Sequence, residues 1–195
     1  MTRFGVGLTA GFVALAALVV VLGSNRKPRA PAAPPGETVK SIMRNEVDPS
    51  GTFLFQSIME ISDYRGITRK APTTDADWKD VAQHLQVLHD APAKLGAPGI
   101  RAAGPKDRAA NPLLENQPRE IQKLLDTQHA DFVRRAGRLR DAADQGLQAA
   151  AAKDKDALFL ALTQIDRACE GCHVHYWYPK DQRAVRAARE AGLMD

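Results

Sequence analysis

Apolar residues after residue 36 recur at the three- and four-residue spacing of amphipathic helices. These stripes fall in four segments and predict four helices. Their positions are Val39, Met43, Val47, Leu54, Ile58 and Ile61 in the first helix, Trp78, Val81, Leu85 and Leu88 in the second, Ile121, Leu125, Phe132, Ala136, Leu139, Ala143 and Leu147 in the third, and Leu158, Ala161, Ile165, Ala168 and Cys169 in the fourth. No segment alternates with a period of two, so we expect no strands. The pattern predicts an all-α, antiparallel four-helix bundle.

Prolines and glycines indicate where these helices bend or end. Pro49 interrupts the first stripe, and we expect a kink or short break over residues 48–51, because proline removes a backbone hydrogen bond and clashes with the preceding turn. Residues 64–73 are expected to form a loop between the first two helices. Pro92 and the stretch 96–118, which is rich in glycine and proline, are expected to form a long crossover.

Capping residues indicate where the later helices begin. Thr74 is expected to cap the second helix, with Asp77 three residues further on. The third helix is expected to run over residues 119–152, and Asp154 is a suitable cap for the fourth. A short helix over residues 182–191 is expected to follow.

The first part of the chain predicts a membrane segment. Phe4–Gly23 is a run of twenty uncharged residues, which as a helix would be about 30 Å long and match the hydrocarbon core of a bilayer. The run is longer than the core of a typical signal peptide, but small residues at its end could form a cleavage site, so an anchor and a cleaved signal both remain open. We divide the chain into residues 1–24, a proline-rich linker at 25–36, and the bundle at 37–195.

The charge of the chain argues against nucleic-acid binding. The formal net charge is +4, and residues 1–36 contain four basic residues and no acidic ones. The remaining 23 basic and 23 acidic residues cancel, since 27 minus 4 equals 23. The bundle therefore has no net excess of the basic residues that bind nucleic acids.

The two cysteines of the chain occur in the sequence Cys169-Glu170-Gly171-Cys172-His173. This pattern is typical of c-type haem attachment, because residues three and four apart share one face of a helix. Both thiols can then bond one haem while the imidazole of His173 binds its iron. A redox-active thiol pair, or a zinc site completed by His175, is the alternative.

The chain resembles cytochrome c′, a class of exported bacterial cytochromes. The resemblance covers residues 37 to about 180, and rests on the haem motif at the end of the last helix, with Tyr176 three residues after His173. It also rests on the run Trp177–Pro179 and on the stretches Val39–Pro49 and Thr74–Trp78. The resemblance implies one covalent haem c in a periplasmic protein. We expect no enzymatic activity, because the sequence shows no acid–base pair beside the distal position of the haem.

Met43 is the predicted sixth ligand of the iron. It lies near the start of the first helix, which in an up-and-down bundle lies beside the end of the fourth. Met59 is sixteen residues later, about 24 Å along a straight helix, and cannot share the same haem. Core packing is the alternative role for Met43, and relatives of cytochrome c′ often leave this position open.

Several other residues are weaker candidates for the haem site. The alternative distal ligands are His84, His89 and His129, the candidate partners of the haem propionates are Lys40, Arg44 and Arg167, and the candidate covers of the haem edge are Trp177 and Tyr178. For each of these residues, ordinary solvation or packing is the expected role.

Two functions follow from the coordination of the iron. With Met43 bound, the protein would be a six-coordinate electron carrier that serves periplasmic or membrane redox proteins. With the sixth position open, it would bind nitric oxide or carbon monoxide. We expect the bundle to be held at the inner membrane by its N-terminal helix, or to be soluble in the periplasm if that segment is cleaved, and a homodimer is left open.

Overall fold

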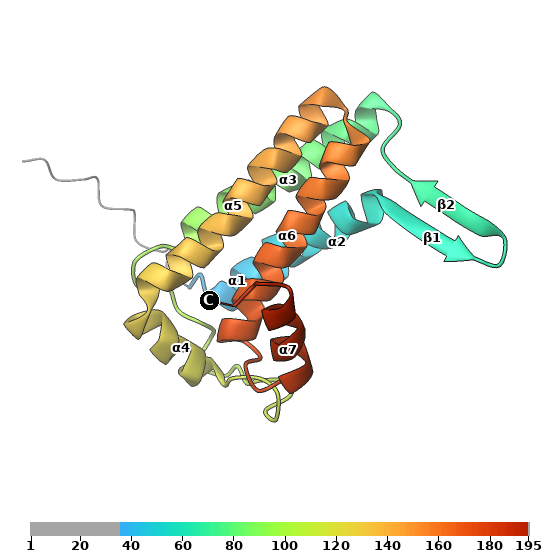
Figure 1. Ribbon diagram of the computed structural model, residues 1–195. Coiled ribbons are helices and arrows are strands. Elements are labelled where there is room, and N and C mark those ends of the chain that lie inside the picture. The colour runs from blue at the N-terminus through green and yellow to red at the C-terminus, as the bar shows by residue number, and fades with distance from the viewer. Residues whose placement is uncertain (1–35, 195) are drawn as a thin grey trace, which may run out of the picture.

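The computed structural model of the chain describes residues 36–194, which are mostly helical (Figure 1). The predicted membrane segment, and the linker apart from Gly36, lie outside these residues. Within residues 36–194, no helix combines the length and the apolar character needed to cross a bilayer.

The first helical unit runs without a break through Pro49. It consists of α1 (Val39–Ile42), the π-helix η1 (Met43–Val47) and α2 (Asp48–Ser57). The N–H of Asp48 donates to the carbonyl of Met43, five residues back. Of the predicted kink or short break, the break was therefore wrong: the wider π turn precedes Pro49, whose missing N–H and ring are poorly accommodated within a regular helix.

A β-hairpin replaces the end of the predicted first helix and most of the predicted loop. Strands β1 (Met59–Asp63) and β2 (Gly66–Lys70) pair antiparallel, with Asp63 opposite Gly66, and extend away from the helices (Figure 1). The expectation of no strands was wrong. The signal was present, since β-branched residues surround a two-residue turn that ends at Gly66, whose φ of +121° favours glycine.

Helix α3 (Asp75–Leu95) begins as predicted and ends later than predicted. The Thr74 side chain accepts from the N–H of Asp77, and the Asp77 side chain accepts from the N–H of Thr74, which confirms the cap. Pro92 lies inside the last turn. The helix continues past it to Leu95, which is 2% exposed and packs in the core.

The predicted third helix is two helices, α4 (Pro118–Thr127) and α5 (His129–Ala152). The chain leaves the helical conformation at Gln128, where φ is −127° and ψ is 31°. Neither glycine nor proline occurs at this break, so the sequence carried no strong signal for it. Pro118 occupies the first turn of α4, a position where proline costs no hydrogen bond.

The last two helices agree with their predictions. Helix α6 (Lys155–Tyr176) begins at Asp154, whose side chain accepts from the N–H of Ala157. Helix α7 (Gln182–Glu190) begins at Asp181 and packs against α6.

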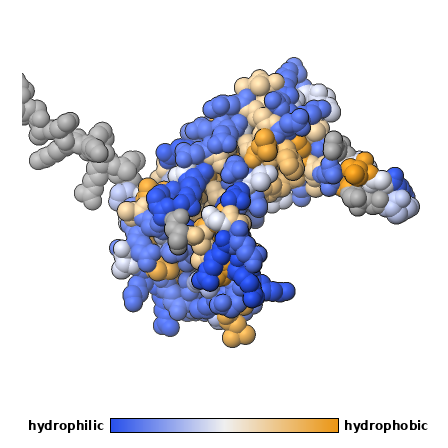
Figure 2. Space-filling view, viewed as in Figure 1, coloured by the Kyte–Doolittle hydropathy of each residue, from blue (hydrophilic) through white to orange (hydrophobic). Residues whose placement is uncertain are grey.

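The core forms where α5 packs against both α3 and α6, while α2 and η1 pack against α3. Gly146 allows α5 to pack closely against α3, because a Cβ atom there would lie 2.5 Å from Cδ2 of Leu85. The largest side chains with almost no exposure are Ile42, Leu54, Leu85, Leu88, Leu95, Leu125, Leu158 and Ile165. The face shown in Figure 2 is largely hydrophilic. Ile61 and Ile67 of the hairpin are exposed apolar residues.

Candidate functional site

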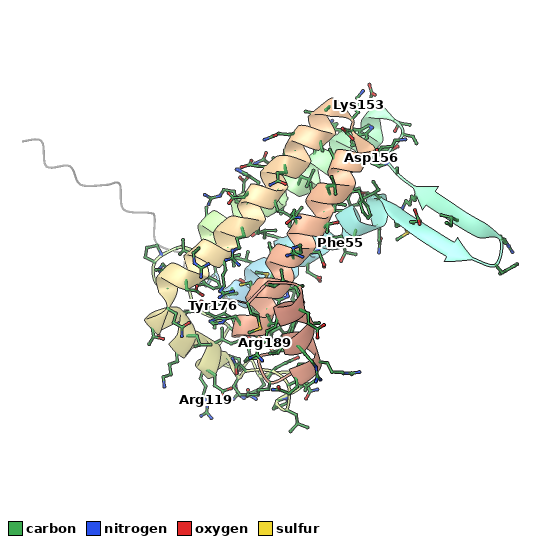
Figure 3. The ribbon with its side chains drawn as sticks, viewed as in Figure 1. Phe55, Arg119, Lys153, Asp156, Tyr176 and Arg189 are labelled. Atoms are coloured by element: carbon green, nitrogen blue, oxygen red, sulfur yellow. The ribbon has the colours of Figure 1, made fainter. Side chains whose placement is uncertain are left out.

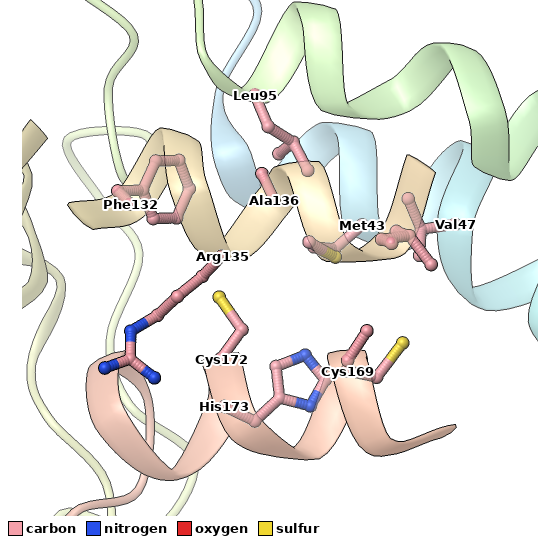
Figure 4. Close-up of a pocket in the computed structure, with 11 residues that line it drawn as sticks. Met43, Val47, Leu95, Phe132, Arg135, Ala136, Cys169, Cys172 and His173 are labelled. Carbon is pink, nitrogen blue, oxygen red and sulfur yellow. The ribbon is translucent and has the colours of Figure 1, made fainter. Parts of the chain in front are cut away.

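The C-terminal half of α6 presents both cysteines and His173 to a small cavity (Figure 4). Both thiols are free. Gly171, between the cysteines, is buried against the C-terminal segment, where a Cβ atom would lie 3.2 Å from the carbonyl oxygen of Leu193. One helical turn therefore brings two sulfur atoms and an imidazole to the same place, as the spacing predicts.

The opposite wall of the cavity is contributed by three other elements. Met43 and Val47 reach it from η1 and Leu95 from α3, while α5 supplies a row of residues. The residues from α5 are Phe132, Arg135, Ala136 and Leu139. The cavity has a volume of about 30 Å³, and most of its lining is apolar. The structure thus brings all four predicted site residues to one cavity.

The thiols are protonated at neutral pH. Burial raises the pKa of Cys169 to about 11, helped by the charges of Asp166 and Glu170, and burial likewise raises the pKa of Cys172 to about 12. Reactive and metal-binding cysteines function as thiolates and have lowered pKa values. Among residues 36–194, no group of three or more acidic, histidine or cysteine side chains is arranged to hold a metal ion. The raised pKa values argue against a redox-active thiol pair.

The imidazole of His173 is neutral and held by aromatic rings. Burial lowers its pKa, and only the neutral ring can bind a metal. The ring meets Trp177 edge to face at 5.2 Å between centroids, and Tyr178 lies 6.0 Å away. The hydroxyl of Tyr178 donates to Glu170 at 2.5 Å. These contacts limit the orientations of the imidazole.

The end of α6 is anchored by the long crossover. The N–H of Asn116 donates to the carbonyl of Trp177 at 2.6 Å, and its side-chain amide donates to the carbonyl of Tyr176 at 3.0 Å. Figure 3 shows Tyr176 at the same end of the molecule as Arg119 of α4 and Arg189 of α7. The crossover, α4 and α7 therefore gather around the end that carries the cavity.

A partly buried ion pair, whose arginine lines the cavity, was missed from the sequence. Arg135 is 5% exposed, and its Nε donates to Asp131 at 2.7 Å. Its Nη1 donates to the carbonyl of Gly171 at 3.1 Å, and the hydroxyl of Tyr176 donates to Asp131 at 3.0 Å. The signal was an acid and a base four residues apart on a helix, which is common on surfaces and does not reveal burial.

The alternative distal ligands are not among the residues that line the cavity. His84 stacks on Phe53 and is 3.3 Å from the Ser50 hydroxyl, while His89 pairs with Asp90 at 2.7 Å. His129 begins α5, and its Nε2 is buried without a hydrogen-bond partner among the described residues. His175, the proposed extra zinc ligand, lies 3.1 Å from the amide oxygen of Gln128. None of these four histidines lines the cavity.

The basic residues proposed for haem propionates also lie outside the cavity lining. Lys40 pairs with Asp107 at 2.5 Å, and Arg167 donates to the carbonyl of Ala191 at 2.7 Å. Arg44 is exposed. Met59, excluded from the site on the basis of its distance along a helix, lies in β1 instead.

Comparisons of the chain with protein-family models, with curated proteins and with solved structures found no match.

Proposed function

We propose that this protein is a c-type cytochrome that holds one covalent haem and transfers electrons. The observation that carries this proposal is the meeting of two free thiols and a neutral imidazole, from one turn of α6, at an apolar cavity. Thioether formation requires two thiols at this spacing, and iron ligation requires a neutral imidazole.

The donor set suits a porphyrin in its chemistry. Cys169 and Cys172 would form the two thioether bonds, and His173 and Met43 would bind the iron. The apolar lining matches the body of a porphyrin. Haem, when bound, supplies a one-electron ferric–ferrous couple.

The cavity is smaller than a usual ligand pocket and must widen to hold a haem. Ligand pockets usually measure about 300–1,000 Å³, whereas this cavity measures about 30 Å³. Haem binding therefore requires the elements that line the cavity opposite α6 to move away from it, among them the wall formed by Met43 and Val47. That wall is the π-helix, and such segments are common at functional sites.

We further infer that the fold is a four-helix bundle of the cytochrome c′ type. The α1–η1–α2 unit would be its first helix, followed by α3, α5 and α6. The packing of α2 on α3, of α3 on α5 and of α5 on α6 supports this order.

Met43 favours electron transfer over gas binding. Its side chain lines the cavity from η1, opposite the cysteines and His173 (Figure 4). A thioether in the sixth position would saturate the iron and raise its reduction potential. The partners would then be redox proteins of the periplasm or the inner membrane, with the protein anchored there by the segment Phe4–Gly23 or released after cleavage.

The decisive experiment is to produce the protein with a cytochrome c maturation system and to extract it with acidic organic solvent. The unmodified protein should keep its haem after extraction. Each single variant, Cys169→Ala or Cys172→Ala, should retain haem through the remaining bond, and the double variant should release it. Stoichiometric zinc without haem in the unmodified protein would refute the proposal.

Two histidine variants provide a matched control. His173→Ala should change the absorption spectrum of the bound haem, because it removes an iron ligand. His175→Ala, two residues away and outside the cavity lining, should leave the spectrum unchanged.

A further inference from the structure

Arg135 places a permanent charge in the wall of the cavity. Guanidinium groups stay protonated in proteins, and Arg135 is the one described lining residue whose side chain is always charged. Its exposed fraction is only 5%. Burial of a charge is costly unless the group is paired and hydrogen bonded, so this position calls for an explanation.

The contacts of Arg135 lead directly to the cysteine motif. Its Nη1 donates to the carbonyl of Gly171, the residue between Glu170 and Cys172, at 3.1 Å. This bond joins α5 to the turn of α6 that carries Cys169, Cys172 and His173. In Figure 4 the Arg135 side chain runs from α5 toward the stretch of α6 that carries Cys172. Arg135 is therefore placed to fix the position of the motif.

Asp131 pairs with this charge but is not among the residues that line the cavity. Its carboxylate accepts from Arg135 Nε at 2.7 Å and from the Tyr176 hydroxyl at 3.0 Å, and it also pairs with Arg134. The Asp131 side chain is 25% exposed, and it does not line the cavity. Water therefore screens the carboxylate more than the guanidinium. The cavity consequently experiences more of the positive charge than of the negative one.

We propose that Arg135 is a positioning residue that holds the haem-binding turn through Gly171 and raises the reduction potential of the haem, with Asp131 acting in the opposite direction. This inference rests on the proposed function. Reduction of ferric iron adds one negative charge to the haem, and a poorly screened cation nearby favours the reduced form.

The test compares reduction potentials of the haem-loaded, full-length protein and its variants. Arg135→Gln should lower the potential by about 59 mV, which corresponds to a tenfold change in the ratio of ferrous to ferric protein. Asp131→Asn should raise the potential, because it removes the opposing charge. Arg134→Gln is the matched control. Arg134 pairs with the same carboxylate, but its own side chain is 49% exposed, so its replacement should change the potential little.

Two further variants separate charge from structural damage. Arg135→Lys keeps the charge. Its reduction potential should therefore differ less from that of the unmodified protein than the potential of Arg135→Gln does. The double variant Asp131→Asn with Arg135→Gln should fall between the two single variants. Damage to packing would shift both single variants in the same direction. If Arg135→Gln yields too little haem protein, Arg135→Lys and Asp131→Asn still test the sign of the effect.

The outcomes distinguish this inference from the proposed function. Absence of covalent haem from the unmodified protein would refute both. Covalent haem with equal potentials in Arg134→Gln and Arg135→Gln, or a lowered potential in Asp131→Asn, would refute the inference alone.

Discussion

Replacement of Met43 tests the assignment of the sixth ligand. Met43 and Val47 line the same cavity from η1, and only Met43 carries an atom that can bind iron. Met43→Leu keeps most of the volume and should cost less than about 1.5 kcal/mol. In the haem-loaded protein it should lower the reduction potential and allow rapid carbon monoxide binding to ferrous iron, because the thioether ligand is lost.

Val47→Ala is the control for packing. Val47 is 7% exposed, and the removal of two buried carbon groups should cost about 2 kcal/mol. For a protein of this size that cost corresponds to a fall in Tm of roughly 4–8 °C. Because Val47 supplies no iron ligand, the spectrum should keep the form that methionine ligation gives it. Met43→Leu should thus change the ligands of the iron with little loss of stability. Val47→Ala should lower the stability and leave the ligands unchanged.

The assays are thermal unfolding, the absorption spectrum and stopped-flow mixing with carbon monoxide. The reasoning fails if the unmodified protein binds carbon monoxide as quickly as Met43→Leu and the two spectra coincide. The iron would then be five-coordinate, and gas binding would become the preferred function.

Three further predictions concern stability and location. Gly137→Ala in α5 should stabilise the protein by about 1 kcal/mol, because nothing lies within 4 Å of the added Cβ. Gly146→Ala in the same helix should instead destabilise it in thermal unfolding, because the Cβ would strike the buried Leu85; equal effects would contradict this. Burial tends to raise the pKa of Asp131, but Arg135 and Tyr176 outweigh this and lower the pKa from 3.8 to about 2. Asp131 should thus stabilise the protein above pH 4 and lose this effect as the pH falls through 2, so the Tm advantage over Asp131→Asn should shrink over that range. If Phe4–Gly23 is an uncleaved anchor, the protein should stay with membranes in alkaline carbonate, and mass spectrometry finding a chain that starts near Ser24 would exclude this.

The sequence predicted the parts of the fold that depend on strong local signals. The caps at Thr74 and Asp154 were correct because a side-chain oxygen three residues before an N–H is a local arrangement. The buried stripe of α3 was correct because the spacing of apolar residues along a helix is also a local signal. The hairpin was missed because Ile61 has the spacing that continues the stripe of the first helix. In the structure Ile61 lies in β1 and is 49% exposed. Spacing alone does not distinguish a strand from a helix over so few residues.

The candidate site could be predicted where the spacing of residues along one helix decides which side chains share a face. Cys169, Cys172 and His173 follow from their spacing on a helix, whatever the packing around them. Arg135 was not predictable, because its importance comes from burial against α6 and from a bond to a backbone carbonyl. Such a contact depends on how two helices pack, which a single sequence does not reveal.

The π-helix η1 is a place at the candidate site where the spacing rule of a regular helix fails. Ile42 and Val47 are both buried although five residues separate them. In a regular helix, five residues at 100° each would leave them about 140° apart, and only one of them could face the interior. A turn closed by a bond from Asp48 to Met43 aligns them on one side. Pro49, which predicts a break, is thus accommodated by the same turn that forms the Met43 and Val47 wall of the cavity.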